Sequence, residues 1–339
     1  MKSYLVIFII LLAAAGLMAQ TPKISDLIVS GVNIKWYDPW GMQFTDPANT
    51  ALVNGQIYYA SQTINGVESA DRIAVTAWLN SRPNPAFNSV VPTAKPGANV
   101  IYTTQSGMSG YIWTYPGILD VDYTITSGGA ITDNSVTLKY ITLGSKIVTI
   151  NYTENGCTAA SATSSTATMV NVAFGDSFGG GKVFYVFVYG QSGYVAGETH
   201  GLIVALADQN AGIEWITGGS TQTTWNGNTL TAIGTGQANT NFMIAQTGFT
   251  GGAAKLCNDY TNTNAGTGIY SDWYLPSSDE LDFLCDNKSS LGGFTSDAYY
   301  WSSSENISSE GKRVTFNGFC YPGWNSKATL YRVRAIRSF

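Results

Sequence analysis

Apolar and polar side chains alternate in short runs near the start of the chain, and turn-forming residues bound each run. Three runs show the pattern: NIKWYD (33–38), QIYYASQTI (56–64) and RIAVTAW (72–78). β-Branched and aromatic residues in such runs favour strands. Asn65-Gly66 predicts a tight hairpin turn, and Trp36 is the expected centre of a small core. We therefore expect a β-sandwich module over residues 20–80.

The pattern returns after a proline-rich boundary. The prolines of this boundary are Pro83, Pro85, Pro92 and Pro96. In the run KIVTINYTENGC, Val148, Ile150 and Tyr152 fall on one face of the expected strand. The Asn-Gly turn at 155–156 repeats the earlier one, which indicates a degenerate internal repeat. A second β-sandwich module is expected over residues 81–168.

The hydrophobic pattern of the sequence changes after SATSSTAT (161–168). This run of small residues predicts a linker. Glycine-rich strand patterns then alternate with short helical patterns near 238–246, 252–260 and 277–288. This mixture predicts an α+β domain over residues 172–339. The expected architecture is therefore multidomain, with two all-β sandwiches followed by an α+β domain.

The stretch SDWYLPSSDEL (271–281) crowds hydroxyl and carboxylate groups together, so it is either a catalytic cluster or a helix start. Ser277 and Glu280 match the capping box S-x-x-E, in which the two side chains satisfy free amides at a helix N-terminus. Leu281 and Leu284 then supply an apolar stripe at helical spacing. We expect Ser277 and Glu280 to be a structural helix cap, and no catalytic residue here.

An apolar run also opens the chain. Lys2 precedes YLVIFIILL (4–12), and small residues follow up to Ala19. The run is short for a membrane span and has the arrangement of a secretory signal peptide. We expect residues 1–19 to be removed on export, and no transmembrane segment after them.

The charge balance and the histidine content argue against some classes of function. Only 12% of the residues are charged, and 17 Lys and Arg stand against 22 Asp and Glu. Nucleic-acid binding depends on neutralising phosphates, so this acidic balance argues against a nucleic-acid partner. His200 is the single histidine, which excludes multi-histidine zinc sites. Its place just before an apolar strand favours a structural role over a catalytic triad.

Cysteine spacing indicates a disulfide in the last third of the chain. The four cysteines are Cys157, Cys257, Cys285 and Cys320. In an oxidising compartment, two of Cys257, Cys285 and Cys320 are expected to pair, and the spacing leaves open which two.

Seven phrases in the second half of the chain carry a family resemblance. In order they are GDSFGGGKVFYV, GLIVALADQNAGIEW, AIGTGQANT, AAKLCNDY, SDWYLPSSDELDFL, YYWSSSE and YRVRAIRSF. Together they resemble the Lcl C-terminal domain family, formerly a domain of unknown function and related to C-type-lectin-like folds. The resemblance covers essentially all of 172–339. It implies a secreted or surface domain in adhesive proteins, the founding adhesin being associated with sulfated glycosaminoglycans, and it carries over no catalytic residue.

The two preceding modules carry a weaker resemblance. KWYD…ALVNGQIYYASQTINGVES resembles small immunoglobulin-like modules of large secreted proteins of Gram-negative bacteria, and residues 98–168 resemble PKD-like or immunoglobulin-like repeats. In such modules Cys commonly follows Asn-Gly, whereas Val67 stands here. The resemblance implies spacing and display, and a secreted or outer-surface location in a Gram-negative bacterium.

The lectin-like resemblance directs the search for a ligand site to the loops between residues 301 and 330. Tyr321 and Trp324, with Asn325 beside them, suit stacking on sugar rings. Basic side chains that suit an acidic glycan are Lys312, Arg313, Lys327, Arg332, Arg334 and Arg337. Of these we expect Lys312, Arg313 and Lys327 to take part, because Arg332 and Arg334 alternate with apolar residues in a terminal strand.

A calcium site is the one cofactor that the resemblance suggests. Glu305-Asn306 and Trp324-Asn325 resemble the Glu-Pro-Asn and Trp-Asn-Asp signatures of calcium lectins, although Ile307 and Ser326 depart from both. Oxygen ligands of this kind suit Ca²⁺. The candidate metal ligands are Glu305, Asn306 and Asn325.

Taken together, the sequence predicts a non-enzymatic, exported, adhesin-type protein. Its C-terminal domain is expected to bind an extracellular glycan or a surface protein, with the two β modules as spacers. One alternative is a structural or assembly module without a discrete ligand. Another is an enzyme on the lectin-like scaffold, which would need a reactive thiol at Cys320. The oligomeric state is left open.

Overall fold

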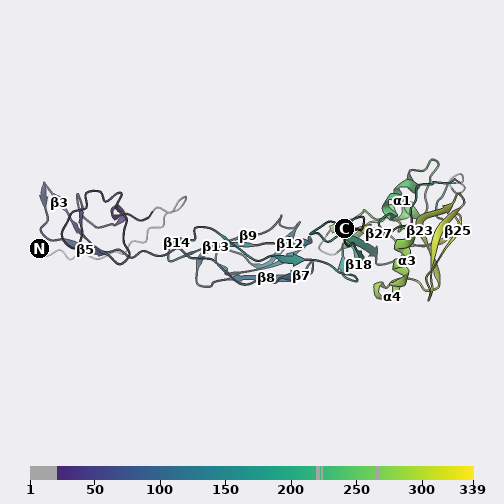
Figure 1. The fold of residues 1–339 in the computed structure, drawn as a ribbon, viewed down its shortest axis with the longest axis horizontal. Coiled ribbons are helices and arrows are strands. Elements are labelled where there is room, and N and C mark those ends of the chain that lie inside the picture. Colours follow the sequence, from purple (N-terminus) through teal and green to yellow (C-terminus); the bar gives the residue numbers. More distant parts are fainter. Residues whose placement is uncertain (1–20, 219–221, 223, 265–267) are drawn as a thin grey trace.

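The computed structural model describes residues 21–339, apart from 219–221, 223 and 265–267. Three lobes follow one another in chain order along the long axis of the molecule (Figure 1). The C-terminus lies at the end of the last lobe that faces the middle lobe, so the strands between residues 298 and 326 lie at the far end. Within the described part of the chain, no helix combines the length and apolar character of a membrane span.

The first lobe is a small β module. Its elements are η1 (Ile24–Asp26), β1 (Lys35–Tyr37), β2 (Ile57–Ser61), β3 (Thr63–Ile64), β4 (Val67–Glu68) and β5 (Ile73–Thr76). β1, β2 and β5 form an antiparallel sheet, and β3 and β4 form a hairpin. Asn65 and Gly66 both have positive φ, as a type I′ turn requires. Trp36 is buried against Tyr58 and Ile24, so the predicted strands, turn and core tryptophan are confirmed.

The hairpin of the first lobe is tied to its sheet by one carboxylate. Glu68 accepts hydrogen bonds from Lys35 Nζ at 2.8 Å, from Ser61 Oγ at 2.6 Å and from the Tyr37 hydroxyl. The bond from Lys35 and the two hydroxyl bonds lower the pKa of Glu68 to about 2. The carboxylate is therefore held in its charged form at the meeting point of β1, β2 and β4.

The second lobe is a β-sandwich. Its strands are β6 (Phe87–Ser89), β7 (Thr93–Ala94), β8 (Asn99–Thr104), β9 (Ser109–Thr114), β10 (Tyr123–Gly128), β11 (Ser135–Tyr140), β12 (Gly144–Lys146), β13 (Thr149–Glu154), β14 (Cys157–Thr158), β15 (Thr163–Ser164) and β16 (Thr168–Val170). One sheet has the order β10-β11-β8-β6, and β9, β14 and β15 pair with β13 in another. β7 pairs in parallel with β16. Side chains of both layers, including Tyr102, Leu138 and Ile150, form one core.

Of two predictions made for this lobe, one is confirmed and one is wrong. Val148, Ile150 and Tyr152 are buried, so the predicted alternation along this strand is confirmed. The predicted linker 161–168 is wrong, because this segment supplies β15 and the start of β16. Its hydroxyls satisfy neighbouring backbone groups, such as the amide of Val148, which donates to Ser165 Oγ at 3.1 Å. Small polar residues therefore act here as strand residues.

The third lobe combines two sheets with helices. Its elements are β17 (Ser177–Phe178), β18 (Gly181–Val186), β19 (Gly201–Ala205), β20 (Asn210–Ile213), α1 (Gly236–Ile244), α2 (Ala253–Asn258), β21 (Asn262–Asn264), β22 (Gly268–Tyr270), α3 (Ser278–Asp286), α4 (Lys288–Leu291), β23 (Ala298–Ile307), β24 (Glu310–Phe316), β25 (Tyr321–Ser326), β26 (Tyr331–Val333) and β27 (Ile336–Ser338). One sheet has the order β17-β18-β19-β27, and the other β20-β26-β23-β24-β25. The predicted α+β character and the three helical stretches are confirmed.

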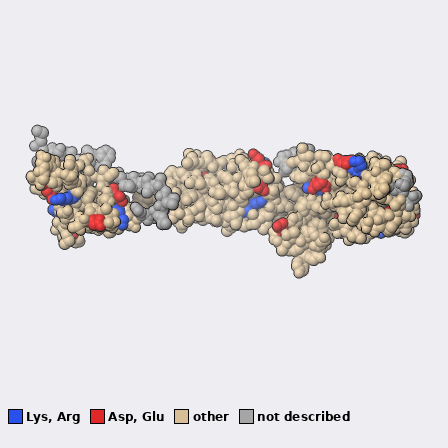
Figure 2. Space-filling model, turned by 90° about the horizontal axis from the view of Figure 1, so that it is seen from above, with Lys and Arg blue, Asp and Glu red and all other residues tan. Residues whose placement is uncertain are grey.

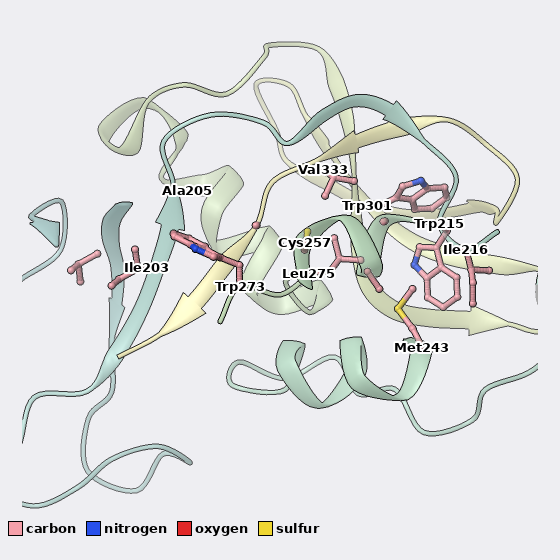
Figure 3. Close-up of a cluster of buried hydrophobic side chains, with 14 of the residues drawn as sticks. Ile203, Ala205, Trp215, Ile216, Met243, Cys257, Trp273, Leu275, Trp301 and Val333 are labelled. Atoms are coloured by element: carbon pink, nitrogen blue, oxygen red, sulfur yellow. The ribbon is translucent and has the colours of Figure 1, made fainter. Parts of the chain in front are cut away.

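Buried tryptophans organise the core of the third lobe (Figure 3). Trp215 and Trp301 lie close to Met243 of α1, and Trp273 packs nearer to Ile203 of β19. The Trp215 indole donates to the Ser302 carbonyl at 2.7 Å, and the Trp301 indole donates to the Ile213 carbonyl at 2.9 Å. Each large apolar ring is thus buried with its one polar atom satisfied.

Polar contacts join neighbouring lobes. Asn80 Nδ2 donates to the Asn155 carbonyl at 2.8 Å, between the first and second lobes. Lys95 Nζ and Asp176 Oδ2 form an ion pair at 2.6 Å, between the second and third lobes. The chain is mostly β, with two β lobes before an α+β C-terminal region.

Candidate functional site

The expected capping box is present at the start of α3. The Ser277 amide donates to Glu280 Oε2 at 2.6 Å, and the Glu280 amide donates to Ser277 Oγ at 3.3 Å. Glu280 also accepts from the Gly234 amide at 2.8 Å, just before α1. One buried carboxylate therefore serves the N-terminal ends of two helices, which is a structural task.

Glu280 also predicts a pH dependence of stability. Burial raises the pKa of Glu280 from 4.5 to about 7, although its backbone hydrogen bonds act in the opposite direction. Between these pH values the unfolded chain binds fewer protons than the folded chain at this group. The free energy of unfolding of the C-terminal domain should therefore fall by about 3 kcal/mol as the pH rises from about 4.5 to about 7.

Urea denaturation of the parent chain and of the Glu280→Gln variant across this pH window tests the prediction. In the variant the free energy of unfolding should lack this dependence on pH, because the amide of glutamine does not titrate and carries no charge to desolvate. Asp286→Asn is the matched control, since Asp286 lies on the same helix and is exposed. Equal slopes for the parent chain and Glu280→Gln would contradict the assignment.

Three of the basic candidates do not face solvent. Arg334 is buried, and its guanidinium bonds to Asp208 and to the carbonyls of Ala205 and Gly293. Arg337 pairs with Asp272. Lys327 has no exposed side-chain surface, so the expectation that it binds a ligand is wrong. Each of these cations is paired with a carboxylate of the same domain.

The partner of Lys327 is Glu305, and the pair removes Glu305 from the candidate metal ligands. Lys327 Nζ donates to Glu305 Oε1 at 2.5 Å, and neither side chain is exposed. Glu305 Oε2 accepts from the amides of Asn226 and Gly227 at 2.9 and 3.1 Å. Both carboxylate oxygens are therefore engaged by protein donors, and the predicted calcium ligand Glu305 is wrong.

The other two metal candidates also have protein partners. Asn306 Nδ2 donates to Glu310 Oε2 at 2.8 Å, and Asn325 Oδ1 accepts from Arg313 Nε at 3.2 Å. Across the described residues, no group of three or more His, Cys, Asp or Glu side chains is placed to hold a metal ion.

Four side chains on β23, β24 and β25 form a polar and aromatic surface, which we call the arginine–tyrosine face: Tyr299, Arg313, Tyr321 and Asn325. The register pairs Tyr299 with Thr315 and Thr315 with Tyr321, and it pairs Gly311 with Asn325. Side chains of paired residues, and of residues two apart, share one face of a sheet. The pairing therefore gathers residues that lie far apart in the sequence.

Arg313 is held in place on this face by its neighbours. Its guanidinium carbon lies 4.6 Å from the centre of the Tyr299 ring. Nε donates to Asn325 Oδ1, and Nη1 donates to Thr315 Oγ1 and to the Tyr321 carbonyl. A Cβ at position 323 would lie 2.9 Å from the guanidinium carbon, so Gly323 leaves the space that Arg313 occupies.

Arg313 differs from the buried arginines in its partners. All of its hydrogen-bond acceptors are neutral, and no carboxylate in the described part of the chain forms an ion pair with it. Tyr321 beside it is 57% exposed, and the neighbouring Phe319 is 77% exposed. The face thus offers an oriented cation next to open aromatic rings. Sequence reasoning missed Tyr299 and Phe319, whose place depends on strand pairing.

The remaining two candidates lie on the opposite face of the sheet. Lys312 pairs with Trp324, one position out of phase with Arg313. Trp324 is 58% exposed and Lys312 is half-buried, on the face that also carries Val314 and Phe316. The six predicted ligand residues are therefore not one site. Arg313, Tyr321 and Asn325 lie on one face of the sheet, Lys312 and Trp324 lie on the other face, and Lys327 is buried.

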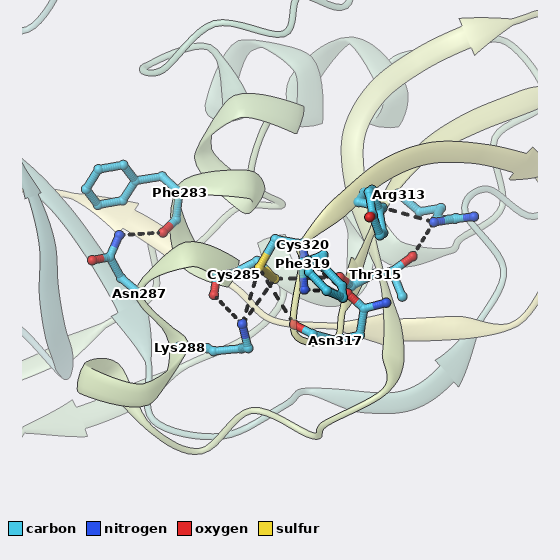
Figure 4. Close-up of a disulfide and its surroundings, with 10 residues drawn as sticks. Phe283, Cys285, Asn287, Lys288, Arg313, Thr315, Asn317, Phe319 and Cys320 are labelled. Carbon is cyan, nitrogen blue, oxygen red and sulfur yellow. Dashed lines mark hydrogen bonds between the residues drawn. A yellow bond between two sulfur atoms is a disulfide. The ribbon is translucent and has the colours of Figure 1, made fainter.

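The cysteines of the domain are placed for structure. Cys285 of α3 and Cys320, just before β25, form a disulfide, with Lys288 Nζ 3.3 Å from Cys320 Sγ (Figure 4). Cys257 is a buried free thiol, and burial raises its pKa well above the usual range. A disulfide-bonded Cys320 does not supply the reactive thiol that the enzyme alternative needs.

His200 lies beside a groove of about 600 Å³ between the second and third lobes. Its Nδ1 lies 3.1 Å from the Phe339 carbonyl, and its Nε2 lies 2.7 Å from Glu198 Oε2. Both ring nitrogens are thus occupied by groups at the chain end and the preceding loop. This arrangement fits the structural role expected for His200.

One side of the molecule is sparsely charged. Figure 2 shows one side of the molecule on which Lys, Arg, Asp and Glu form small separate spots between uncharged residues. On this side the charged residues do not gather into a basic groove.

Comparison with known proteins finds distant structural similarity. No model of a protein family matches the chain, and no curated protein matches it. A fimbrial protein from Bacteroides ovatus is 15% identical, with a TM-score of 0.34, over 83% of this chain and 76% of that one. The Yersinia pseudotuberculosis adhesin InvE is 11% identical, with a TM-score of 0.24, over 86% and 80%.

Domains 4 and 5 of the S-layer protein SbsC are also similar, with 15% identity and a TM-score of 0.22 over 41% of this chain and 75% of that one. The structures to which the chain is similar thus include an S-layer protein, a fimbrial protein and an adhesin. At TM-scores this low, the similarity does not define the ligand or the function of the chain.

Proposed function

We propose that this chain is a non-enzymatic, exported surface protein of the adhesin type. Its C-terminal domain binds an extracellular glycan or another surface component, and the two β modules act as spacers. The arrangement of three lobes in a row, with the arginine–tyrosine face in the lobe farthest from the N-terminus, supports this division of labour. The signal-like apolar run at residues 4–12 supports export.

The single observation that carries the proposal is the setting of Arg313. An exposed aromatic surface suits the apolar face of a sugar ring, and an oriented guanidinium suits an acidic or hydroxyl group beside it. Neutral acceptors and the Tyr299 ring hold the guanidinium in place before a ligand arrives. Such preorganisation reduces the entropy lost on binding.

The phrase order in 172–339 supports a lectin-like relationship of the Lcl C-terminal type, and the module resemblance supports a Gram-negative outer surface. The proposed binding does not use calcium, because Glu305 and Asn325 are engaged by protein donors. Chelation should therefore leave binding intact, while high salt should weaken it through Arg313.

A glycan array probed with the chain lacking its first nineteen residues tests the proposal. We expect binding to a defined glycan class, with Tyr321→Ala and Arg313→Gln each weakening it about tenfold or more. Trp324→Ala is the matched control, because Trp324 is equally exposed but lies on the opposite face.

Three outcomes would count against the proposal. Equal losses for Trp324→Ala and Tyr321→Ala would remove the arginine–tyrosine face as the site. Loss of binding with chelator would show a metal site elsewhere. Binding to no glycan and no extracellular protein, together with self-association of the chain, would favour the assembly alternative.

A further inference from the structure

A second exposed tryptophan lies in the domain, away from every candidate named from sequence. Trp225 is 53% exposed, within a segment that we call the tryptophan loop, residues 224–230. Its indole lies over Gly227, where a Cβ would be 2.7 Å from Nε1 and where φ is +73°. Only glycine accommodates both this close approach and this backbone conformation. The conformation of the loop and the placement of the ring therefore depend on each other.

The buried ion pair holds the tryptophan loop on both sides of Trp225. Lys327 Nζ donates to the Thr224 carbonyl at 2.9 Å, and Glu305 Oε2 accepts from the amides of Asn226 and Gly227. A further bond runs from Asn226 Nδ2 to the Phe242 carbonyl of α1 at 3.0 Å. The residues before and after Trp225 are thus fixed to the sheet and to a helix.

A single exposed apolar residue is ordinary on a protein surface and needs no explanation. Trp225 is different because fully buried charges anchor its neighbours. A buried ion pair is a weak source of stability, since desolvation opposes the Coulomb attraction, and an apolar pair of similar volume often stabilises as well. The contacts that the pair does provide are backbone contacts of the tryptophan loop. The pair is therefore placed to hold the backbone of this loop.

The segment of the chain that carries Trp225 is uncharged. The sequence has no Asp, Glu, Lys, Arg or His between Glu214 and Lys255, whereas Thr, Asn and Gln are frequent there. Asn228, exposed in the same loop, carries an amide, and the charge of Lys327 is neutralised inside by Glu305. A charged ligand finds no counter-charge on this segment. A ligand with an apolar face and many hydroxyl groups finds both kinds of partner.

We infer that the tryptophan loop is a binding platform for a neutral saccharide. A pyranose ring stacks on the exposed indole of Trp225, and neighbouring amides and hydroxyls bind its hydroxyl groups. Glu305 and Lys327 are positioning residues that hold the platform. This inference rests on the proposed function and adds to it a site separate from the arginine–tyrosine face and a ligand class.

An array of neutral oligosaccharides, including cellohexaose, chitohexaose and mannohexaose, tests the platform with the full exported chain. The best-bound saccharide is then titrated calorimetrically into variants. Trp225→Ala should weaken binding at least about tenfold, as expected for a tryptophan at the centre of a site. Trp324→Ala removes an equally exposed tryptophan and should leave the affinity unchanged. Binding to no neutral saccharide, or unchanged binding by Trp225→Ala, overturns the inference.

The positioning role has its own test. Glu305→Leu combined with Lys327→Met replaces the ion pair by apolar side chains and leaves Trp225 in the chain. If the pair positions the loop, this variant stays folded, its Trp225 becomes more accessible to acrylamide relative to a Trp225→Phe reference, and its saccharide affinity falls about tenfold. Unchanged affinity in a folded double variant would show that the pair has only a structural role.

The two sites fail in distinguishable ways. Tyr321→Ala should not change neutral-saccharide binding, and Trp225→Ala should not change binding at the arginine–tyrosine face. If every ligand found depends on Tyr321 and Arg313 alone, the platform fails and the proposed function stands. If binding depends on Trp225 alone, the platform stands and the arginine–tyrosine face is not the ligand site.

Discussion

Lys327→Met is expected to lower the free energy of unfolding of the C-terminal domain by about 3–5 kcal/mol. The reason is the negative charge that remains buried on Glu305. Without the ammonium group, the Glu305 carboxylate stays fully buried with two backbone amides as its partners. The loss is measured by urea denaturation followed by tryptophan fluorescence, to which the domain contributes five of the nine tryptophans.

An exposed ion pair supplies the control for this prediction. Lys255 Nζ and Asp259 Oδ2 lie 2.5 Å apart one turn along α2, with about half of each side chain exposed. Lys255→Met should cost no more than about 0.5 kcal/mol, because water screens this pair. Equal effects of Lys255→Met and Lys327→Met would contradict the buried position of Lys327.

The double replacement Glu305→Leu with Lys327→Met separates stability from positioning. Removing both charges leaves no isolated ion in the interior, so most of the stability lost in Lys327→Met should return. The freed amides of Asn226 and Gly227 reach water only if the tryptophan loop moves outward. A stable double variant with a displaced loop is therefore the expected result.

Removing the disulfide should lower the free energy of unfolding by about as much as Lys327→Met does. Cys285 and Cys320 are 35 residues apart, and closing a loop of this length in the unfolded chain corresponds to about 4 kcal/mol of stability. The bond joins α3 to the end of the β24–β25 turn, next to Phe319. Cys285→Ala with Cys320→Ala should lower the free energy of unfolding by about this amount.

Reductant provides the control for the disulfide. Dithiothreitol should destabilise the parent chain toward the level of the double alanine variant and leave that variant unchanged. Cys257→Ala, which removes a buried free thiol, should keep the response to reductant. A parent chain whose unfolding does not respond to reductant would contradict the pairing.

Local patterns predicted the elements of this protein well, because the physical causes lie within a few residues. Alternation placed Val148, Ile150 and Tyr152 in a core, since side chains along a strand point to opposite faces in turn. The Asn-Gly turns and the capping box at Ser277 act over two to four residues. The run 161–168 was misjudged because small hydroxyl residues suit both linkers and edge strands.

The candidate ligand site was only partly accessible from sequence. The structure places Arg313, Tyr321 and Asn325 on one face of the sheet, but residue type alone did not distinguish Arg313 from Lys327. Both are basic residues next to short aromatic and polar stretches. Their difference lies in partners: Lys327 meets Glu305 in the interior, whereas Arg313 meets neutral acceptors at the surface.

The sequence by itself determined a mostly β chain with a capped helix in an α+β C-terminal region, because short-range patterns specify strands, turns and caps. Only the tertiary structure decided which charged side chains form buried ion pairs and which aromatic rings remain exposed to solvent. Burial of Glu305 and Lys327, and exposure of Trp225 between their contacts, depends on bringing together segments separated by about eighty to one hundred residues. Packing over such distances has no local signature in the sequence.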